Sequence, residues 1–265
     1  MKIFSASEVS AALPWDALID AIRTTFAEGS HQPLRNHFRV GSGDLLLMPA
    51  WTDGGFIGVK LVTVFPENAQ RDLPSVASFY VLFDAATGLP LAQLDGGPLT
   101  ARRTAASSVL AATYLARKDS RVLGVFGTGK VSRGLVEAYA ATFPLETILL
   151  CGRDPERTRA AARELAHVPG VVAAPAERLF AEADILSAAT LSHTPIITGD
   201  RLRPGVHVDL VGAYRPDMRE SDDRVMSVAD AIFVDTREGG LTEAGDIVQA
   251  MASGAISEAT IAGTL

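Results

Sequence analysis

The 265-residue sequence contains a single cysteine, Cys151, and five histidines. One cysteine excludes an intrachain disulfide, and because Cys151 ends an apolar run we expect a buried, unreactive thiol. The histidines show no H-x-x-H or H-x-E spacing, so we expect no metal site. The sequence also lacks the G-x-S-x-G motif of serine acyl transferases. Disulfide, metal and serine-nucleophile chemistry are therefore disfavoured.

Positive charge and long hydrophobic runs are also scarce. The formal net charge is -7 at pH 7, which argues against a polyanionic partner, since nucleic-acid binding needs a basic surface. No run of about 18 uncharged apolar residues could span a bilayer, and the first residues have no apolar core typical of a signal peptide. We therefore expect neither nucleic acid nor a membrane as a partner, and a cytoplasmic location.

Apolar residues nevertheless make up 48% of the chain, enough for the core of one large domain or two moderate ones. Up to about residue 118 the pattern predicts an α+β domain. It contains an amphipathic helix at 15–28, strands at 45–48, 58–62 and 78–83, a hairpin turn at 84–88 that pairs 89–94 with the preceding strand, and an alanine-rich helix at 103–117.

The segment 122–132, VLGVFGTGKVS, is the most informative stretch of the chain. An apolar run ends in a glycine-spaced turn and leads directly into a helical pattern, which predicts a dinucleotide-binding turn. Gly127 permits the tight turn, Gly129 lacks the Cβ that would block a pyrophosphate, and Ser132 is small enough for close helix–strand packing. The helix N-terminus would supply amides and a positive dipole to the phosphates. The alternative is a strand–helix turn that binds nothing.

The surroundings of this turn predict a parallel sheet with helices between its strands. Strands are expected at 122–126, 147–151, 171–172, 185–188, 206–211 and 231–234. The fold class is therefore α/β, with a Rossmann-type doubly wound nucleotide domain over 119–237 following the α+β domain over 1–118.

The residues after the second strand of this domain bear on the choice of cofactor. An NAD site places an acid there for the ribose 2′-hydroxyl, whereas a 2′-phosphate needs an arginine. Here the strand leads into Arg153, and Arg157 follows one helical turn later, so we favour NADPH over NADH. In the alternative reading, Asp154 serves the ribose or caps the helix that starts at Pro155.

Three cations of the first domain predict a site for a carboxylate. Arg35 falls in a loop, Lys60 in the middle of an apolar strand, and Arg103 at the expected start of a helix, where a cation is unfavourable without a nearby anion. The alternatives are a solvent-facing strand position for Lys60 and a surface position for Arg103. His193 lies in a loop that could reach a nicotinamide, although a loop histidine without function is at least as good a reading.

Four motifs of the first domain resemble those of the ornithine cyclodeaminase/μ-crystallin family. They are Phe65-Pro66-Glu67-Asn68, Leu73-Pro74-Ser75-Val76, the segment 84–90, and Leu99-Thr100 followed by Arg103-Thr104-Ala105-Ala106. The resemblance covers nearly the whole chain. It implies a homodimer in which residues 1–118, completed by 238–265, form the dimerising, substrate-binding half. Family members continue beyond the position of Leu265 with a helix that closes the junction of the two domains.

Matched position by position, the resemblance also implies roles for single residues. Arg35, Lys60 and Arg103 would hold the substrate carboxylate, with Lys60 and Arg103 as the catalytic candidates, and Ser75 would line the pocket. The expected cofactor-binding residues are Gly127, Thr128, Gly129, Lys130, Val131, Arg153, Thr190 and Gly212.

Tyr214 distinguishes among members of this family. Cyclodeaminases and related alanine dehydrogenases carry an aspartate where this chain has Tyr214, and Asp217 lies three residues too far along the chain to replace it. The segment 212–220, together with 234–237 and 243–246, resembles the ketimine reductases and Δ1-pyrroline-2-carboxylate reductases. Tyr214 would then pack on the substrate ring.

The sequence thus predicts an NADPH-dependent reductase of cyclic imino acids that needs no metal. The expected reaction converts Δ1-pyrroline-2-carboxylate to L-proline, with Δ1-piperideine-2-carboxylate to L-pipecolate as a second candidate reaction. The proton for the imine could arrive on the substrate or come from a bound water, and Lys60 is the only obvious side-chain donor near the site. A cyclodeaminase or amino-acid dehydrogenase of the same family, and a non-catalytic NADPH-dependent binding protein of the μ-crystallin type, remain as alternatives.

Overall fold

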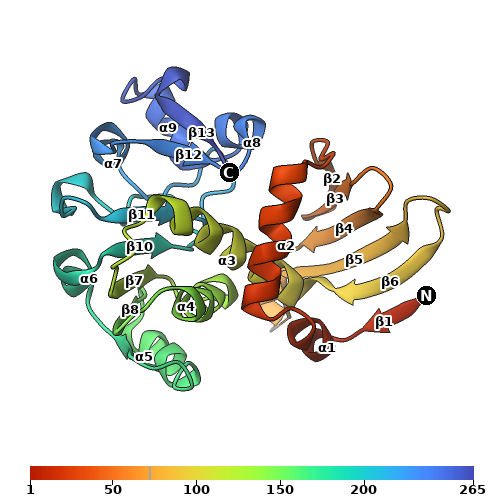
Figure 1. Ribbon diagram of the computed structural model, residues 1–265, viewed down its shortest axis with the longest axis horizontal. Helices are drawn as coiled ribbons and strands as arrows, with labels where there is room; N and C mark the ends of the chain where they lie inside the picture. The colour runs from red at the N-terminus through yellow and green to blue at the C-terminus, as the bar shows by residue number, and fades with distance from the viewer. Residues whose placement is uncertain (72) are drawn as a thin grey trace. The chain divides into compact units, whose positions relative to one another are not determined.

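The computed structural model describes residues 1–71 and 73–265, and these divide into two units, Met1–Arg103 and Thr104–Leu265 (Figure 1). The division falls inside helix α3 (Gly96–Leu115), whereas the sequence places the domain boundary at about 118. The boundary drawn from the sequence follows the end of this helix, because the helix continues without a break past Arg103, where the two units divide.

The first unit is a six-stranded sheet in the order β1-β6-β5-β4-β3-β2, in which β2 to β6 form an antiparallel meander and β1 pairs parallel to β6. Helix α2 covers the predicted range and buries Leu18 and Ile19. The elements are β1 (Lys2–Phe4), α1 (Ala6–Ala11), α2 (Trp15–Glu28), β2 (Asn36–Val40), β3 (Gly43–Trp51), β4 (Phe56–Val64), the 3₁₀ helix η1 (Pro66–Arg71), β5 (Val76–Asp84) and β6 (Pro90–Asp95).

The hairpin turn between β5 and β6 is confirmed. The Asp84 carboxylate accepts hydrogen bonds from the Ala86 and Thr87 amides at 2.9 and 2.8 Å, and Gly88 takes a φ of +70° that favours glycine. Side chains alternate between the faces of the sheet, and the strand register puts several exposed apolar side chains on a single face. They are Ile3, Phe38, Val40, Trp51 and Phe79, which are 37 to 67% exposed.

Helix α3 starts earlier than the sequence predicts. The Asp95 carboxylate accepts a hydrogen bond from the Gly97 amide at 2.8 Å, and the helix runs from Gly96 rather than from 103. Glycines at 96 and 97 are poor helix formers, so the pattern alone misses this first part. Arg103 therefore lies about two turns into the helix, and the expectation that it stands at a helix N-terminus is wrong.

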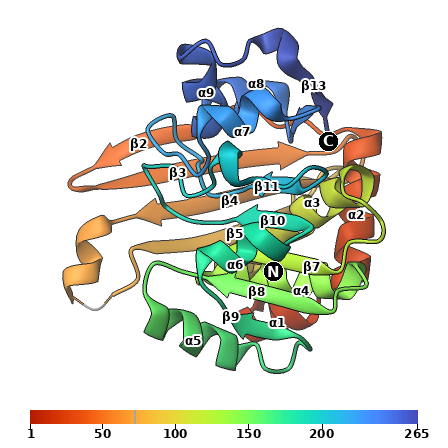
Figure 2. The same ribbon diagram turned by 90° about the vertical axis from the view of Figure 1, so that its left-hand side faces the viewer.

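The second unit contains a five-stranded parallel sheet in the order β11-β10-β7-β8-β9 (Figure 2). The chain passes from β7 outward to β8 and β9, then returns to β10 beside β7 and continues to β11. This is the doubly wound arrangement, and the predicted α/β fold class is confirmed. The elements are β7 (Val122–Phe126), α4 (Lys130–Thr142), β8 (Thr147–Cys151), α5 (Pro155–Glu164), β9 (Val171–Ala173), α6 (Ala176–Glu182), β10 (Ile185–Ala188), the 3₁₀ helix η2 (Gly199–Arg201) and β11 (His207–Leu210).

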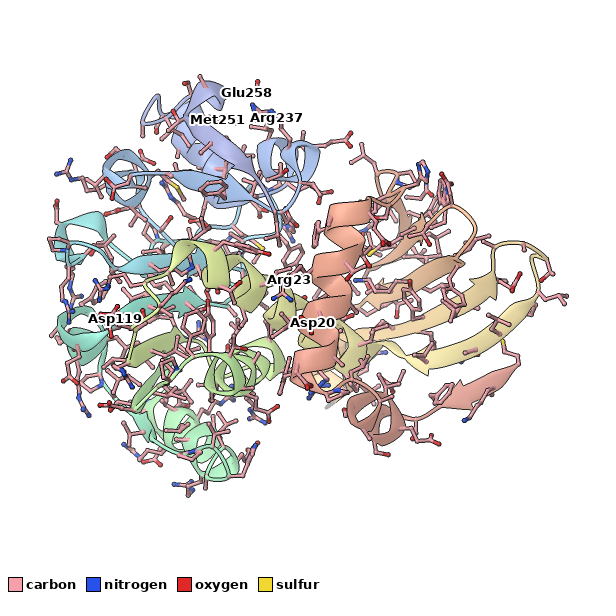
Figure 3. The ribbon with its side chains drawn as sticks, viewed as in Figure 1. Asp20, Arg23, Asp119, Arg237, Met251 and Glu258 are labelled. Atoms are coloured by element: carbon pink, nitrogen blue, oxygen red, sulfur yellow. The ribbon has the colours of Figure 1, made fainter. Side chains whose placement is uncertain are left out.

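The strand predicted at 231–234 forms, but outside the five-stranded sheet. β12 (Ile232–Val234) pairs with β13 (Ile261–Thr264) in a separate two-stranded sheet. Ile247 of α9 (Gly245–Ala252) packs with Ile232 and Ile261, and Arg237 of α8 (Arg237–Thr242) lies 3.5 Å from Glu258 of the 3₁₀ helix η3 (Glu258–Thr260) (Figure 3). α7 (Asp223–Val228) leads into this part. Residues 238–265 thus group with the second unit, and their expected role in completing the first domain stays a prediction.

Candidate functional site

The glycine turn after β7 has the tight geometry that its sequence predicts. Gly127 has a φ of +118°, and a Cβ at this position would lie 2.6 Å from Ser132 Oγ and 2.7 Å from the Ala189 carbonyl oxygen. Any other residue is therefore excluded by both conformation and space. Ser132 is fully buried, and its hydroxyl donates to the Ala189 carbonyl at 3.3 Å. The turn thus packs directly against the segment that follows β10.

Gly129 is the N-cap of α4, and a Cβ there would meet open space. Lys130 is exposed and Val131 half-buried at the start of the helix. The first amides of a helix have no carbonyl partner within it, so this end favours an anion. The sheet order reverses between β7 and β10, and doubly wound sheets bind their ligands outside the carboxyl ends of the strands at such a point. These residues fit a dinucleotide.

Arg153 and Asp154, which follow β8, make different contacts although they are adjacent in the chain. A Cβ on Gly152 would lie 2.7 Å from Thr128 Cγ2, so Arg153 directly follows a residue that touches the glycine turn. Arg153 is exposed and has no hydrogen-bond or ion-pair partner within 1–71 and 73–265. Asp154 instead caps α5, accepting from the Glu156 and Arg157 amides at 2.9 and 3.3 Å, and Arg157 Nε lies 3.7 Å from the same carboxylate.

Thr190 and Gly212, which follow β10 and β11, are held by a residue that the sequence analysis did not single out. Glu220 is fully buried. Its Oε1 accepts from the Thr190 amide and hydroxyl at 2.6 and 2.7 Å, and its Oε2 accepts from the Gly212 and Val211 amides at 2.6 and 3.2 Å. Burial raises the pKa of Glu220 to about 7 against the opposing effect of these hydrogen bonds. In the sequence, Glu220 is recognisable only as the acidic residue that ends the segment 212–220.

Tyr214 is 48% exposed, and its amide donates to the Gly212 carbonyl at 3.0 Å. Asp217 is paired with Arg215 at 2.6 and 2.8 Å, and the hydrogen bond from this guanidinium holds the pKa of Asp217 below its usual range. His193 Nδ1 lies 2.8 Å from the Asp217 carbonyl oxygen. Asp217 is therefore already committed to a surface ion pair.

In the first unit, Lys60 lies in the middle of a row of side chains across the sheet. The strand register places it directly opposite Met48 of β3 and Tyr80 of β5, and Tyr80 opposite Leu94 of β6. Directly opposite residues share a face of the sheet. Lys60 is the only cation among these four described residues. The Tyr80 hydroxyl occupies the position of the missing Gly58 side chain, since a Cβ there would lie 1.7 Å from it.

The structure brings the three predicted cations together. Burial lowers the pKa of Lys60 to about 8, and the positive charges of Arg103 and Arg35 act in the same direction. Lys60 is half-buried and has no hydrogen-bond or ion-pair partner in the part of the chain that the structure describes. A desolvated ammonium beside two guanidinium groups is an arrangement that favours a bound anion.

The neighbouring Arg102 has a different task. Its Nε donates to the Leu13 carbonyl at 2.9 Å, and its guanidinium lies 3.8 Å from the ring centre of Trp15. Of the two adjacent arginines, only Arg103 acts on Lys60. Ser75 is half-buried, and its carbonyl accepts from the Phe65 amide at 2.7 Å, which ties the residue to the end of β4. Whether Ser75 lines a pocket stays a prediction.

Among the described residues, no cluster of three or more His, Cys, Asp or Glu residues could hold a metal ion. Within the same ranges, no helix combines the length and apolar character needed to cross a membrane. Burial raises the pKa of the Cys151 thiol, which disfavours a reactive thiolate.

The chain is similar in sequence and structure to several known proteins. An uncharacterised protein of Schizosaccharomyces pombe is 40% identical over 97% of this chain and 82% of its own length. The Δ1-pyrroline-2-carboxylate reductase of Paracoccus denitrificans is 37% identical over the whole of this chain and 84% of its own. The structure of Thermococcus litoralis Δ1-pyrroline-2-carboxylate reductase in complex with NADH and L-proline is 32% identical, with a TM-score of 0.93 over 100% of this chain and 84% of that one.

The family model for the ornithine cyclodeaminase/mu-crystallin family matches residues 1–265. Together with the identities above, this match confirms the resemblance drawn from the motifs of the first domain. The chain belongs to the ornithine cyclodeaminase/mu-crystallin family.

Proposed function

We propose that this protein reduces Δ1-pyrroline-2-carboxylate to L-proline, with NADPH preferred over NADH and Δ1-piperideine-2-carboxylate as a second substrate. The broader class, an oxidoreductase that reduces an imine with a nicotinamide cofactor, rests on the family and on its named relatives. The observation that carries the finer proposal is the desolvated Lys60 beside Arg35 and Arg103, because this charge arrangement suits the carboxylate of an imino acid.

The proposed substrate site uses the three cations to hold and orient the substrate. A carboxylate bound between Lys60 and Arg103 relieves the repulsion that lowers the pKa of Lys60. Fixing the carboxylate also fixes the imine carbon, a positioning effect that removes several kcal/mol of the barrier. The imine must be protonated to accept hydride, and we propose the Lys60 ammonium as the group that holds this proton.

The proposed cofactor site is the switch point between β7 and β10. Gly127, Thr128, Gly129, Lys130 and Val131 would hold the pyrophosphate, Arg153 a 2′-phosphate, and Thr190 and Gly212 the nicotinamide end. The open space beside Gly129 and the Arg153 guanidinium, unpartnered among the described residues, fit such a ligand. A reduced nicotinamide supplies the hydride.

We also propose that the protein forms a homodimer through the sheet face that carries Phe38, Trp51 and Phe79. Isolated exposed apolar residues are ordinary, but several on one sheet face indicate a contact surface. A second copy is the occupant that the family resemblance implies. A solution mass equal to one chain of 27.9 kDa would rule this out.

The reaction itself is tested with the purified wild-type protein. We expect oxidation of NADPH with Δ1-pyrroline-2-carboxylate and no release of ammonia from ornithine in the presence of NAD. Ornithine cyclodeamination needs a base beside the reacting centre, and this chain has Tyr214 where the cyclodeaminases carry an aspartate. Ammonia and proline produced from ornithine as fast as the imine is reduced would restore the cyclodeaminase assignment.

Arg103→Ala and Arg102→Ala form a matched pair that tests the carboxylate site. Removing Arg103 should lower kcat/KM for the imino acid, because a desolvated carboxylate loses a charged partner. The loss should correspond to a transition-state free energy raised by about 2 to 4 kcal/mol. Removing Arg102 should lower the unfolding midpoint in urea and leave kcat/KM within about threefold. Equal kinetic losses in the two variants would reject the site.

Lys60 should produce an alkaline limb in the pH profile of kcat/KM for the imino acid. The free enzyme loses the Lys60 proton near pH 8, so carboxylate binding should weaken as the pH rises through this value. Lys60→Arg keeps its charge over this range and should move the limb to higher pH at the cost of some activity. A limb at the same pH in both proteins would assign it to another group.

Arg153→Ala tests the preference for NADPH. Loss of a charge-assisted contact to the 2′-phosphate should weaken NADPH by about 10- to 100-fold and change the NADH dissociation constant little. Arg157→Ala is the control, since Arg157 is placed beside Asp154 and should affect NADPH less. The two dissociation constants are measured by the fluorescence of the bound dihydronicotinamide, and equal losses for both cofactors would contradict the assignment.

A further inference from the structure

Glu220 joins the two loops that leave the carboxyl ends of β10 and β11. Each carboxylate oxygen serves a different loop, Oε1 the Thr190 amide and hydroxyl and Oε2 the Val211 and Gly212 amides. All four groups are donors, so the ionised carboxylate satisfies them without leaving a polar group unpaired. The loops also touch directly, because a Cβ on Gly212 would lie 2.0 Å from the Thr190 carbonyl oxygen.

A second buried acid supports Glu220 from behind. Asp246, at the start of α9, accepts from the Glu220 amide at 3.1 Å and from the Ser221 amide and hydroxyl at 2.7 Å. The Ile196 and Ile197 amides donate to the Glu220 carbonyl at 2.8 and 2.9 Å. The backbone of Glu220 is therefore fixed on both sides, and its side chain can transmit this rigidity to the loops.

The Thr190 loop adjoins the glycine turn. The carbonyl oxygen of Ala189, which precedes Thr190, accepts the hydrogen bond from the Ser132 hydroxyl and would lie 2.7 Å from a Cβ at position 127. In a doubly wound fold the pyrophosphate lies at the first turn and the dinucleotide extends across the reversal of strand order. On the cofactor placement of the proposed function, the Thr190 and Gly212 loops lie on the nicotinamide side of this reversal.

We propose that Glu220 is a positioning residue for imine reduction, which fixes the main chain at Thr190 and Gly212 as the wall that holds the nicotinamide end of the cofactor. Glu220 does not touch the cofactor or the substrate. The Thr190 hydroxyl donates its proton to Glu220 and accepts from the Ser192 amide at 3.3 Å. This hydroxyl is thus part of the wall, and its proton is not available to a ligand.

Glu220→Gln is the informative substitution, because it keeps the size of the side chain but directs an amide NH₂ toward one pair of donors. Asp184→Asn is the matched control. Asp184 accepts from the Arg121 and Val122 amides at 2.8 and 3.1 Å and precedes β10, so it joins backbone groups at the opposite, amino-terminal end of the strands. Both variants should be less stable in urea, but only Glu220→Gln should disturb the cofactor wall.

Four measurements separate positioning from stability. In the protein without cofactor, hydrogen exchange of the Thr190 and Gly212 amides should accelerate in Glu220→Gln and not in Asp184→Asn. The NADPH dissociation constant, measured by fluorescence without substrate, should rise about 10-fold, and kcat should fall by about 10- to 100-fold, the effect expected when a reacting group is misplaced. The primary deuterium isotope effect on kcat should increase because hydride transfer becomes slower.

Unchanged NADPH affinity and isotope effect in a folded Glu220→Gln protein would overturn the proposal, even with faster amide exchange. If this variant does not fold, Thr190→Val decides, since it keeps Glu220 and removes the hydroxyl that donates to Glu220 and accepts from the Ser192 amide. Weaker NADPH binding than in Asp184→Asn then supports the proposal, and equal binding overturns it. Failure of the wild-type protein to bind a nicotinamide cofactor would instead contradict the proposed function, and the amide-exchange comparison would still report on the Glu220 contacts.

Discussion

The burial of the Lys60 ammonium beside Arg103 and Arg35 is the constraint on which the proposed substrate site depends. A half-buried ammonium loses hydration, and two nearby guanidinium groups add to the free-energy cost of its charge, so the pKa of Lys60 falls to about 8. In the proposed complex, the negative charge of a substrate carboxylate would offset both effects. The sheet holds the Lys60 backbone in this position, because the register of three strands places Lys60 between Met48 and Tyr80.

In the second unit, several loops lie close together at one end of the parallel sheet. Gly127 achieves this by size, since a Cβ at this position would clash with Ser132 Oγ and the Ala189 carbonyl oxygen. Glu220 achieves it by hydrogen bonding, because one carboxylate serves donors from two loops. Small residues permit close approach, and the buried acid makes that approach rigid.

The distinction between reductase and cyclodeaminase rests on which acids are free to act. Tyr214 stands where the cyclodeaminases and related alanine dehydrogenases carry an aspartate. Asp217, the nearest acid along the chain, is held by Arg215 at 2.6 and 2.8 Å, and Glu220 is buried behind the loops. In the described part of this segment, both carboxylates are therefore already engaged in hydrogen bonds, and neither is free to act as a base. This arrangement favours direct reduction of an imine.

The sequence by itself determined the elements whose signals are local. The glycine turn, the helix at 15–28, the hairpin at Asp84–Gly88 and the alternation of strands and helices after residue 118 all follow from spacing, turn chemistry and periodicity. The family could also be recognised from short motifs. Prediction of helix bounds failed where the local residues are untypical of a helix. The glycines at 96 and 97 are poor helix formers, so the sequence pattern misses the start of α3.

Only the tertiary structure decided which charged residues interact. Arg102 and Arg103 are adjacent and chemically identical, yet one stacks on Trp15 and the other acts on Lys60. Asp154 caps a helix, and Arg153 beside it is left without a partner in the described residues. Glu220 carries no local signal, because its four donors come from residues 8 to 30 positions away. Burial and electrostatic interaction depend on distances through space, which only the folded chain sets.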